Sequence, residues 1–188
     1  MKLNRTKPLV TLAVMILLLS GAGIAYKAFA SKSNQPTYPE EELILAYDFL
    51  VYDSSGSEVR LSDHRGTPVV VNFWTSWCPP CVSELPDFND VWRDKQGEVL
   101  FMMVNVTDGK RETQKTAEAF LLDGGFDFPA YFDLDLDAAE AYGVSSIPMT
   151  FFIDKYGYFV AYTRGAIDAA LLGQGIDMTI EAGGKRRP

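Results

Sequence analysis

Six consecutive residues, Val69 to Trp74, form an almost wholly apolar run (VVVNFW) that ends at polar residues on its C-terminal side. A strand with one face in water alternates apolar and polar side chains, so a continuous run predicts a strand that is buried on both faces. Such strands lie in the centre of sheets that are covered on both sides. This run therefore restricts the chain to architectures in which other segments pack on both faces of a central sheet.

The segments around this run alternate between strand patterns and helix patterns. Strands are predicted at 43–53, 58–63, 69–74, 98–106, 128–133, 148–154 and 158–165, and helices at 79–95, 110–125, 134–144 and 166–182. Pro86 predicts a kink in the first helix, and Gly173 and Gly175 weaken the pattern of the last one. The order predicts an α/β fold with a central mixed sheet, helices on both faces and an N-terminal β-hairpin.

The first 30 residues are predicted to be a membrane-targeting segment. The basic start MKLNRTK precedes a charge-free run from Pro8 to Tyr26, which as a helix would reach nearly ~30 Å, the thickness of a hydrocarbon core. This length favours an uncleaved membrane anchor, while the small residues of 28–30 leave a cleaved signal peptide open. In both cases we expect the rest of the chain outside the cytoplasm. A linker at 31–42, a domain at 43–182 and a tail at 183–188 are expected to follow.

The charge of the chain argues against one class of partner. The net charge is −8, and the basic residues of the first 30 leave the rest more acidic still. Nucleic-acid binding depends on Lys and Arg side chains that neutralise phosphates, so no nucleic-acid partner is expected. Nothing in the sequence indicates an oligomer, and a monomer is expected.

The only two cysteines, Cys78 and Cys81, follow the central strand directly. A disulfide between them would scarcely restrict the unfolded chain, so it would be a poor structural crosslink. With His64 as the only histidine, one chain lacks the roughly four ligands of a zinc site, and no metal or other cofactor is expected. We expect His64 at the surface, although a Cys–His pair stays open. A lone Cys-x-x-Cys suits redox chemistry, which predicts a redox-active disulfide.

The positions of the two cysteines predict different roles for them. Cys78 should cap the following helix, whose partial positive charge stabilises a thiolate, so Cys78 should attack and Cys81 should resolve. Pro79 and Pro80 lack N–H groups that could donate to the thiolate, so its pKa should be less depressed than in pairs with donating residues. Glu84 shares a helix face with Cys81 and could relay a proton; an exposed carboxylate is the alternative.

Two motifs, VVVNFWTSWCPPCVSELP at 69–86 and GVSSIPMTFFID at 143–154, resemble the thioredoxin superfamily. Within it the chain is similar to the TlpA/ResA/DsbE-like membrane-anchored thiol–disulfide oxidoreductases, over roughly 43–181. The resemblance implies a thioredoxin-like fold with a βα insertion around 107–131. It also implies that Cys78 is the nucleophile and Cys81 the resolving cysteine.

The resemblance assigns further residues to the site. It implies substrate contacts for five residues around the pair: Trp77, Pro79, Pro80, Ile147 and Pro148. The Ile147–Pro148 bond would be cis and would face the disulfide. Glu84 matches an active-site carboxylate of ResA-like members. Cytosolic thioredoxins carry a buried acid six residues before the first cysteine, and this chain has Asn72 there, which leaves Glu84 as the candidate acid or base.

The resemblance also implies a function. The chain would be an extracytoplasmic reductase of disulfides in exported proteins, with apocytochrome c in cytochrome c maturation as an implied client. A membrane electron donor of the CcdA/DsbD type would return it to the dithiol form. Two alternatives stay open: an oxidant that forms disulfides in exported proteins, and a non-catalytic thioredoxin-like binding module. A peroxidase is disfavoured, because no further cysteine is present to act as a peroxidatic residue.

Overall fold

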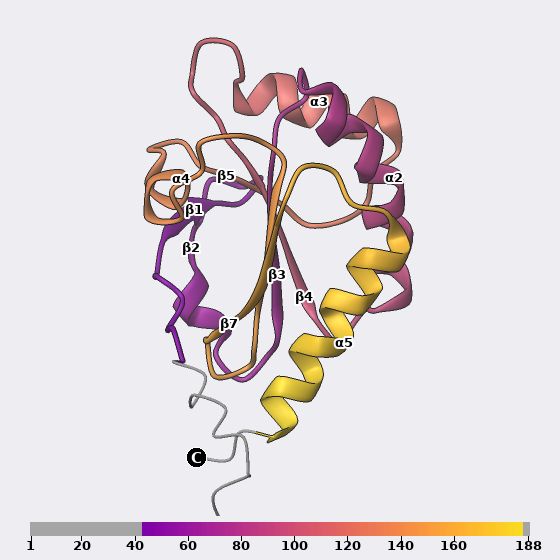
Figure 1. Ribbon diagram of the computed structural model, residues 1–188. Helices are drawn as coiled ribbons and strands as arrows, with labels where there is room; N and C mark the ends of the chain where they lie inside the picture. The colour runs from indigo at the N-terminus through magenta and orange to yellow at the C-terminus, as the bar shows by residue number, and fades with distance from the viewer. Residues whose placement is uncertain (1–42, 186–188) are drawn as a thin grey trace, which may run out of the picture. The chain divides into compact units, whose positions relative to one another are not determined.

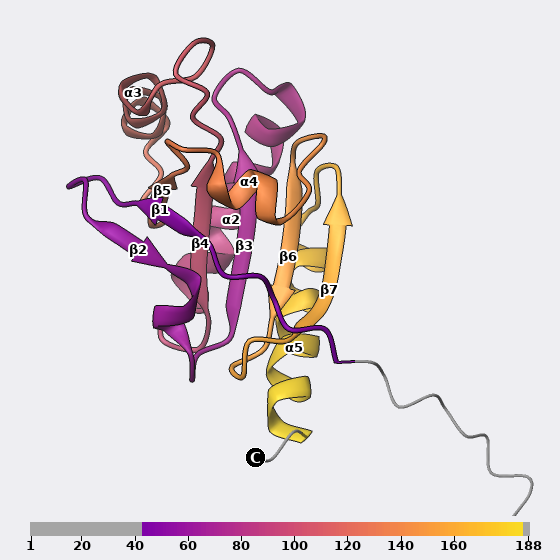
Figure 2. The same cartoon turned by 90° about the vertical axis from the view of Figure 1, so that its left-hand side faces the viewer.

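A seven-stranded sheet in the order β2-β1-β5-β4-β3-β6-β7 organises residues 43–185, the part of the chain that the computed structural model describes (Figures 1 and 2). The strands are β1 (Leu50–Tyr52), β2 (Glu58–Arg60), β3 (Val69–Trp74), β4 (Leu100–Asn105), β5 (Ala130–Phe132), β6 (Met149–Ile153) and β7 (Phe159–Arg164). The helices are the 3-10 helix η1 (Leu61–His64), α2 (Pro79–Asp94), α3 (Gln114–Gly124), α4 (Asp137–Ala141) and α5 (Ala169–Lys185).

The predicted membrane segment over 1–30 and the linker over 31–42 lie outside the described residues. Within 43–185, no helix combines the length and the apolar character needed to cross a bilayer.

The sheet is mixed, as the sequence predicted. The strands β3, β4 and β5 run parallel to one another, whereas β6 is antiparallel to β3 and β1 is antiparallel to β5. The strands β1 and β2 form the predicted N-terminal hairpin, with Val51 opposite Val59. The α/β fold class and the thioredoxin-like architecture are therefore confirmed.

The central strand β3 is buried along its whole length, and its side chains alternate between two cores. Val70 and Trp74 point into a core with residues of α2, α3 and α5, while Val71 and Phe73 point into a second core with residues of α4 and the segment before β1. Figure 1 shows α2 and α5 on one side of the sheet and α4 on the other. The apolar run of β3 is therefore continuous because both faces of the strand are buried, as the sequence predicted.

Several predicted boundaries were wrong. The strand expected over 58–63 ends at Arg60, where η1 begins, and the helix expected over 134–144 is limited to α4. The strand expected over 43–53 is limited to β1, because residues 44–46 bond instead to residues 157–159 at the start of β7: Ala46 N–H donates to Gly157, and Phe159 N–H donates to Ile44. The helix expected at 110–125 starts only at Gln114, because the carboxylate of Asp108 accepts the backbone N–H groups of residues 110–112 and holds them in a loop. The helix α5 covers Ala169–Lys185, so it begins and ends three residues later than the helix predicted over 166–182.

The two glycines of α5 lead to a stability prediction. A Cβ atom on Gly175 would overlap the ring of Phe152 in β6, whereas a Cβ on Gly173 meets nothing within 4 Å. Gly175→Ala should therefore lower the free energy of unfolding by about 1–3 kcal/mol through overpacking. Gly173→Ala, in the same helix, should raise it by up to about 1 kcal/mol through helix propensity. Urea denaturation of the two variants tests this, and equal shifts would contradict the close packing of α5 on β6.

Candidate active site

The two cysteines lie where β3 ends and α2 begins. Cys78 is the N-cap residue of α2, and Cys81 lies in its first turn, with the two joined by a disulfide across 5.3 Å between Cα atoms. Cys78 is 4% exposed and Cys81 is fully buried in the core beneath α2. A client can therefore reach only the sulfur of Cys78, which fits the order of attack that the sequence predicted.

The prolines between the cysteines limit the hydrogen bonds that Cys78 can accept. The Sγ atom of Cys78 accepts the N–H of Cys81 at 3.4 Å. Pro79 and Pro80 occupy the first two positions of the helix and have no N–H to donate. A Cys78 thiolate would keep the helix dipole and one N–H donor, so it would be stabilised less than in a helix start with three donors.

The loop before β6 covers the disulfide from the opposite side. The carbonyl oxygen of Ile147 lies 3.7 Å from Sγ of Cys78, and the Ile147–Pro148 bond is cis, as the resemblance implied. Pro148 is buried, and Ile147 is partly exposed. On the open side of the site, Trp77, Pro79 and Pro80 are exposed. The five residues expected to contact substrate thus all surround Cys78.

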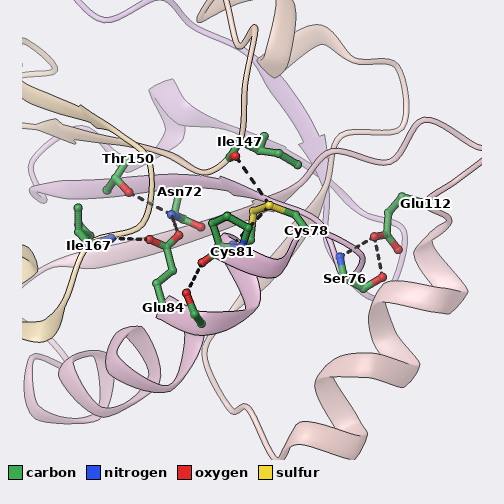
Figure 3. The surroundings of a disulfide bond; sticks show 11 residues. Asn72, Ser76, Cys78, Cys81, Glu84, Glu112, Ile147, Thr150 and Ile167 are labelled. Carbon is green, nitrogen blue, oxygen red and sulfur yellow. Dashed lines mark hydrogen bonds between the residues drawn. A yellow bond between two sulfur atoms is a disulfide. The ribbon is translucent and has the colours of Figure 1, made fainter.

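Glu84 is buried, and the alternative of an exposed carboxylate is wrong. Its side chain is 2% exposed, and its two oxygens accept the side-chain N–H of Asn72 at 2.9 Å and the backbone N–H of Ile167 at 3.0 Å. Asn72 also donates to Thr150 Oγ1 at 3.0 Å, which joins β3, β6 and α2 in one buried polar group (Figure 3). Burial raises the pKa of Glu84 to about 7, although both hydrogen bonds oppose this rise.

A carboxyl group with this pKa is half ionised near neutral pH. It can therefore accept a proton or donate one under the same conditions, which is the property of a general acid–base catalyst. Because Glu84 follows Cys81 by three helical residues, both side chains lie on the buried face of α2. The arrangement thus places a carboxyl group that can take up or release a proton on the same buried helix face as the resolving cysteine, sheltered from water.

A second buried carboxylate next to the site, Glu112, was not predicted. It is fully buried, and its Oε2 atom accepts the backbone N–H of Ser76 at 2.6 Å and the Ser76 hydroxyl at 2.8 Å. Its Oε1 atom accepts the hydroxyl of Thr116 at 2.7 Å. In the view of Figure 3, Glu84 and Glu112 flank the disulfide on opposite sides. Glu112 thus ties the loop before α3 to the turn that carries Cys78.

His64 lies at the other end of the sheet from the cysteines. It ends η1, before β3 begins, whereas Cys78 follows the last residue of β3. The six residues of β3 span about 20 Å, so His64 cannot form a nucleophile pair with Cys78. In residues 43–185, no group of three or more His, Cys, Asp or Glu side chains is arranged to hold a metal ion.

Comparisons with known proteins agree on one family. The model of the AhpC/TSA family matches residues 45–162. The thiol-disulfide oxidoreductase ResA of Geobacillus thermodenitrificans is 39% identical over 145 residues, which cover 76% of this chain and 80% of the relative. ResA of Bacillus cereus is 31% identical over 170 residues, covering 88% of this chain and 91% of the relative.

Solved structures of the same kind superpose on the described domain. The crystal structure of StoA from Bacillus subtilis has 26% identity and a TM-score of 0.61, over 70% of this chain and 97% of StoA. The exposed lipoprotein thioredoxin of Streptococcus pneumoniae has 29% identity and a TM-score of 0.59, over 70% of this chain and 98% of that protein. Residues 45–162, which the family model matches, contain β3, the Cys-x-x-Cys turn and the cis-proline loop.

Proposed function

Because the chain belongs to the AhpC/TSA family and is a thiol–disulfide oxidoreductase similar to ResA, we propose that it works as a reductase of disulfides in exported proteins. In the proposed reaction, the Cys78 thiolate attacks one sulfur of a client disulfide and forms a mixed disulfide. The Cys81 thiol then loses its proton and attacks Cys78, which releases the client dithiol and leaves the Cys78–Cys81 disulfide. Two electrons pass from the protein to the client in each cycle.

The observation that supports reduction rather than oxidation of clients is the small number of backbone N–H donors to Cys78 at the start of α2. Strong thiol oxidants stabilise their reduced form, mainly through a well-stabilised thiolate. Here only Cys81 donates an N–H to Sγ of Cys78, since the two residues between them are prolines. The thiolate is therefore weakly stabilised, which favours the disulfide form and makes the dithiol a good electron donor.

We further propose a location and partners for this reaction. The predicted membrane segment at the N-terminus would hold the domain on the extracytoplasmic side as a single-pass protein. Away from cytosolic reductants, the oxidised protein would need a membrane electron donor, and a CcdA/DsbD-type protein is the candidate that the family resemblance supplies. Exported disulfide proteins, with apocytochrome c among them, would be the clients.

The midpoint potential of the Cys78–Cys81 pair tests the direction. Purified protein would be equilibrated with glutathione and dithiothreitol buffers, and its free thiols would be trapped and counted. We expect a potential of about −250 mV or lower, close to the roughly −270 mV of thioredoxin. A value near about −120 mV, typical of a strong oxidant, would show that the protein forms disulfides instead.

A further inference from the structure

The loop between β4 and α3 is fixed in shape and anchored to the active-site turn. The Oδ1 atom of Asp108 accepts the N–H groups of Lys110, Arg111 and Glu112 at 2.8, 2.8 and 2.9 Å. The Glu112 side chain then reaches Ser76, two residues before Cys78. The loop therefore cannot move independently of the turn that carries the nucleophile.

This loop places a cation on the exposed side of the site. The guanidinium carbon of Arg111 lies 3.4 Å from the centre of the Trp77 ring, a stacked cation–π contact. Trp77 is 37% exposed and directly precedes Cys78, which is itself only 4% exposed. The Trp77 ring and the arginine that covers it therefore belong to the exposed surface next to the nucleophile in the chain.

Arg111 keeps its hydrogen-bonding capacity free. No carboxylate of residues 43–185 forms an ion pair with it; the ion pairs of this part of the chain involve Arg60, Arg93, Lys95 and Lys185. Stacking uses the flat face of a guanidinium and leaves the N–H groups at its edge, whose fork geometry matches a carboxylate.

We propose that Arg111 is a specificity-determining residue, which binds a client carboxylate adjacent to the disulfide that Cys78 attacks. The proposal rests on the reductase function above and names its substrate class: disulfides with Asp or Glu beside a cysteine. The acidic surface elsewhere repels such segments, so attraction at one cation beside the nucleophile favours the orientation in which the client disulfide meets Cys78.

The test uses peptides that differ at one position. Three peptides with the same internal disulfide would carry Asp, Asn or Lys next to the attacked cysteine. The pre-reduced full chain would be mixed with each peptide, and the second-order rate constant of peptide thiol formation would be measured at low salt. We expect the Asp peptide to react about tenfold faster than the Asn peptide, because a charged hydrogen-bonded pair stabilises the encounter. The Lys peptide should be slower than both.

Three variants test whether Arg111 causes the preference for the Asp peptide. Arg111→Gln keeps a side chain of similar length without the charge, and we expect it to remove the preference for the Asp peptide over the Asn peptide. Arg111→Lys keeps the charge without the planar fork and should retain only part of the preference. Lys110→Gln is the matched control, since it removes an exposed cation from the same loop away from Trp77, and it should keep the preference.

Different results would overturn different statements. Equal rates for all three peptides with the wild-type protein would refute the carboxylate site while leaving the reductase function intact. A uniform loss of rate in Arg111→Gln, together with a raised pKa of Cys78, would show that Arg111 stabilises the thiolate instead of the client. No reduction of any peptide would count against the reductase function itself.

Discussion

Replacing Cys78 with serine is expected to abolish the reduction of client disulfides. The thiolate is the nucleophile in thiol–disulfide exchange, and a serine hydroxyl stays protonated at neutral pH and does not attack sulfur. Cys81 cannot take over, because it is fully buried beneath α2. The measurement is the rate of peptide disulfide reduction by pre-reduced protein, and turnover above the uncatalysed rate in Cys78→Ser would contradict the assigned role.

Cys81→Ser is the control that separates attack from resolution. This variant keeps the nucleophile Cys78, so it should still react once with a client disulfide. Without Cys81 the mixed disulfide has no internal thiol to resolve it, and a covalent complex should accumulate. Mass spectrometry would detect one client per chain, joined through Cys78. A variant that released its client at the wild-type rate would show that Cys81 is not the resolving residue.

Glu84→Gln is expected to lower the reduction rate at pH 7.5 by about 10²-fold or more, the usual contribution of a general acid–base group. The pKa of Glu84 is raised to about 7, so at this pH most of the carboxyl is ionised and can accept the proton of Cys81. The wild-type rate should rise as pH increases through 7. In Glu84→Gln this rise should move to the higher pKa of the thiol itself, about 8.5.

Asp87→Asn provides a matched control for Glu84→Gln. Asp87 lies one turn further along α2, and its carboxylate also accepts a backbone N–H at the start of α5, that of Ala169 at 3.1 Å. It is only partly buried, and it lies further from Cys81 along the helix. Asp87→Asn should therefore leave the rate and its pH profile close to wild type. A loss equal to that of Glu84→Gln would mean that both carboxylates act only by holding the α5 segment.

The same burial predicts a pH-dependent stability. The folded state holds the proton of Glu84 more tightly than the unfolded state, because the pKa rises from its ordinary 4.5 to about 7. The contribution of Glu84 to the free energy of unfolding is fully present below about pH 4.5 and is lost as pH rises through 7. The total loss is about 3 kcal/mol. In Glu84→Gln, this part of the decrease in unfolding free energy should disappear. An unchanged slope between pH 4.5 and 7.5 would contradict the raised pKa.

The sequence predicted the features that depend on local pattern. The strand over 69–74 has the predicted bounds, and the helix after Cys78 ends within one residue of its prediction. Both sequence signals are strong, because a continuous apolar run indicates a central buried strand and two prolines are compatible with the first turn of a helix. The cysteine pair could be assigned to redox chemistry by its spacing, because few other sites are built from two cysteines alone.

Long-range contacts explain what the sequence did not show. Glu112 lies among Lys and Arg residues in a segment with helical propensity, and nothing local indicates that its carboxylate is buried against Ser76, 36 residues earlier. One of the two partners of Glu84 could not be found either, because Ile167 contributes only a backbone N–H, which every residue except proline carries. The stacking of Arg111 on Trp77 follows from the same loop closure and has no signature in either segment.

Cys81 is a component of the main hydrophobic core, and this links electron transfer to folding. In a thermodynamic cycle, the unfolding free energies of the oxidised and reduced forms differ by the same amount as the potentials of the disulfide in the folded and unfolded chain. A fold that makes its dithiol a good reductant must favour the disulfide, and every 30 mV of this effect corresponds to about 1.4 kcal/mol. Each electron pair given to a client therefore makes the domain more resistant to unfolding, and each pair received from the donor makes it less so.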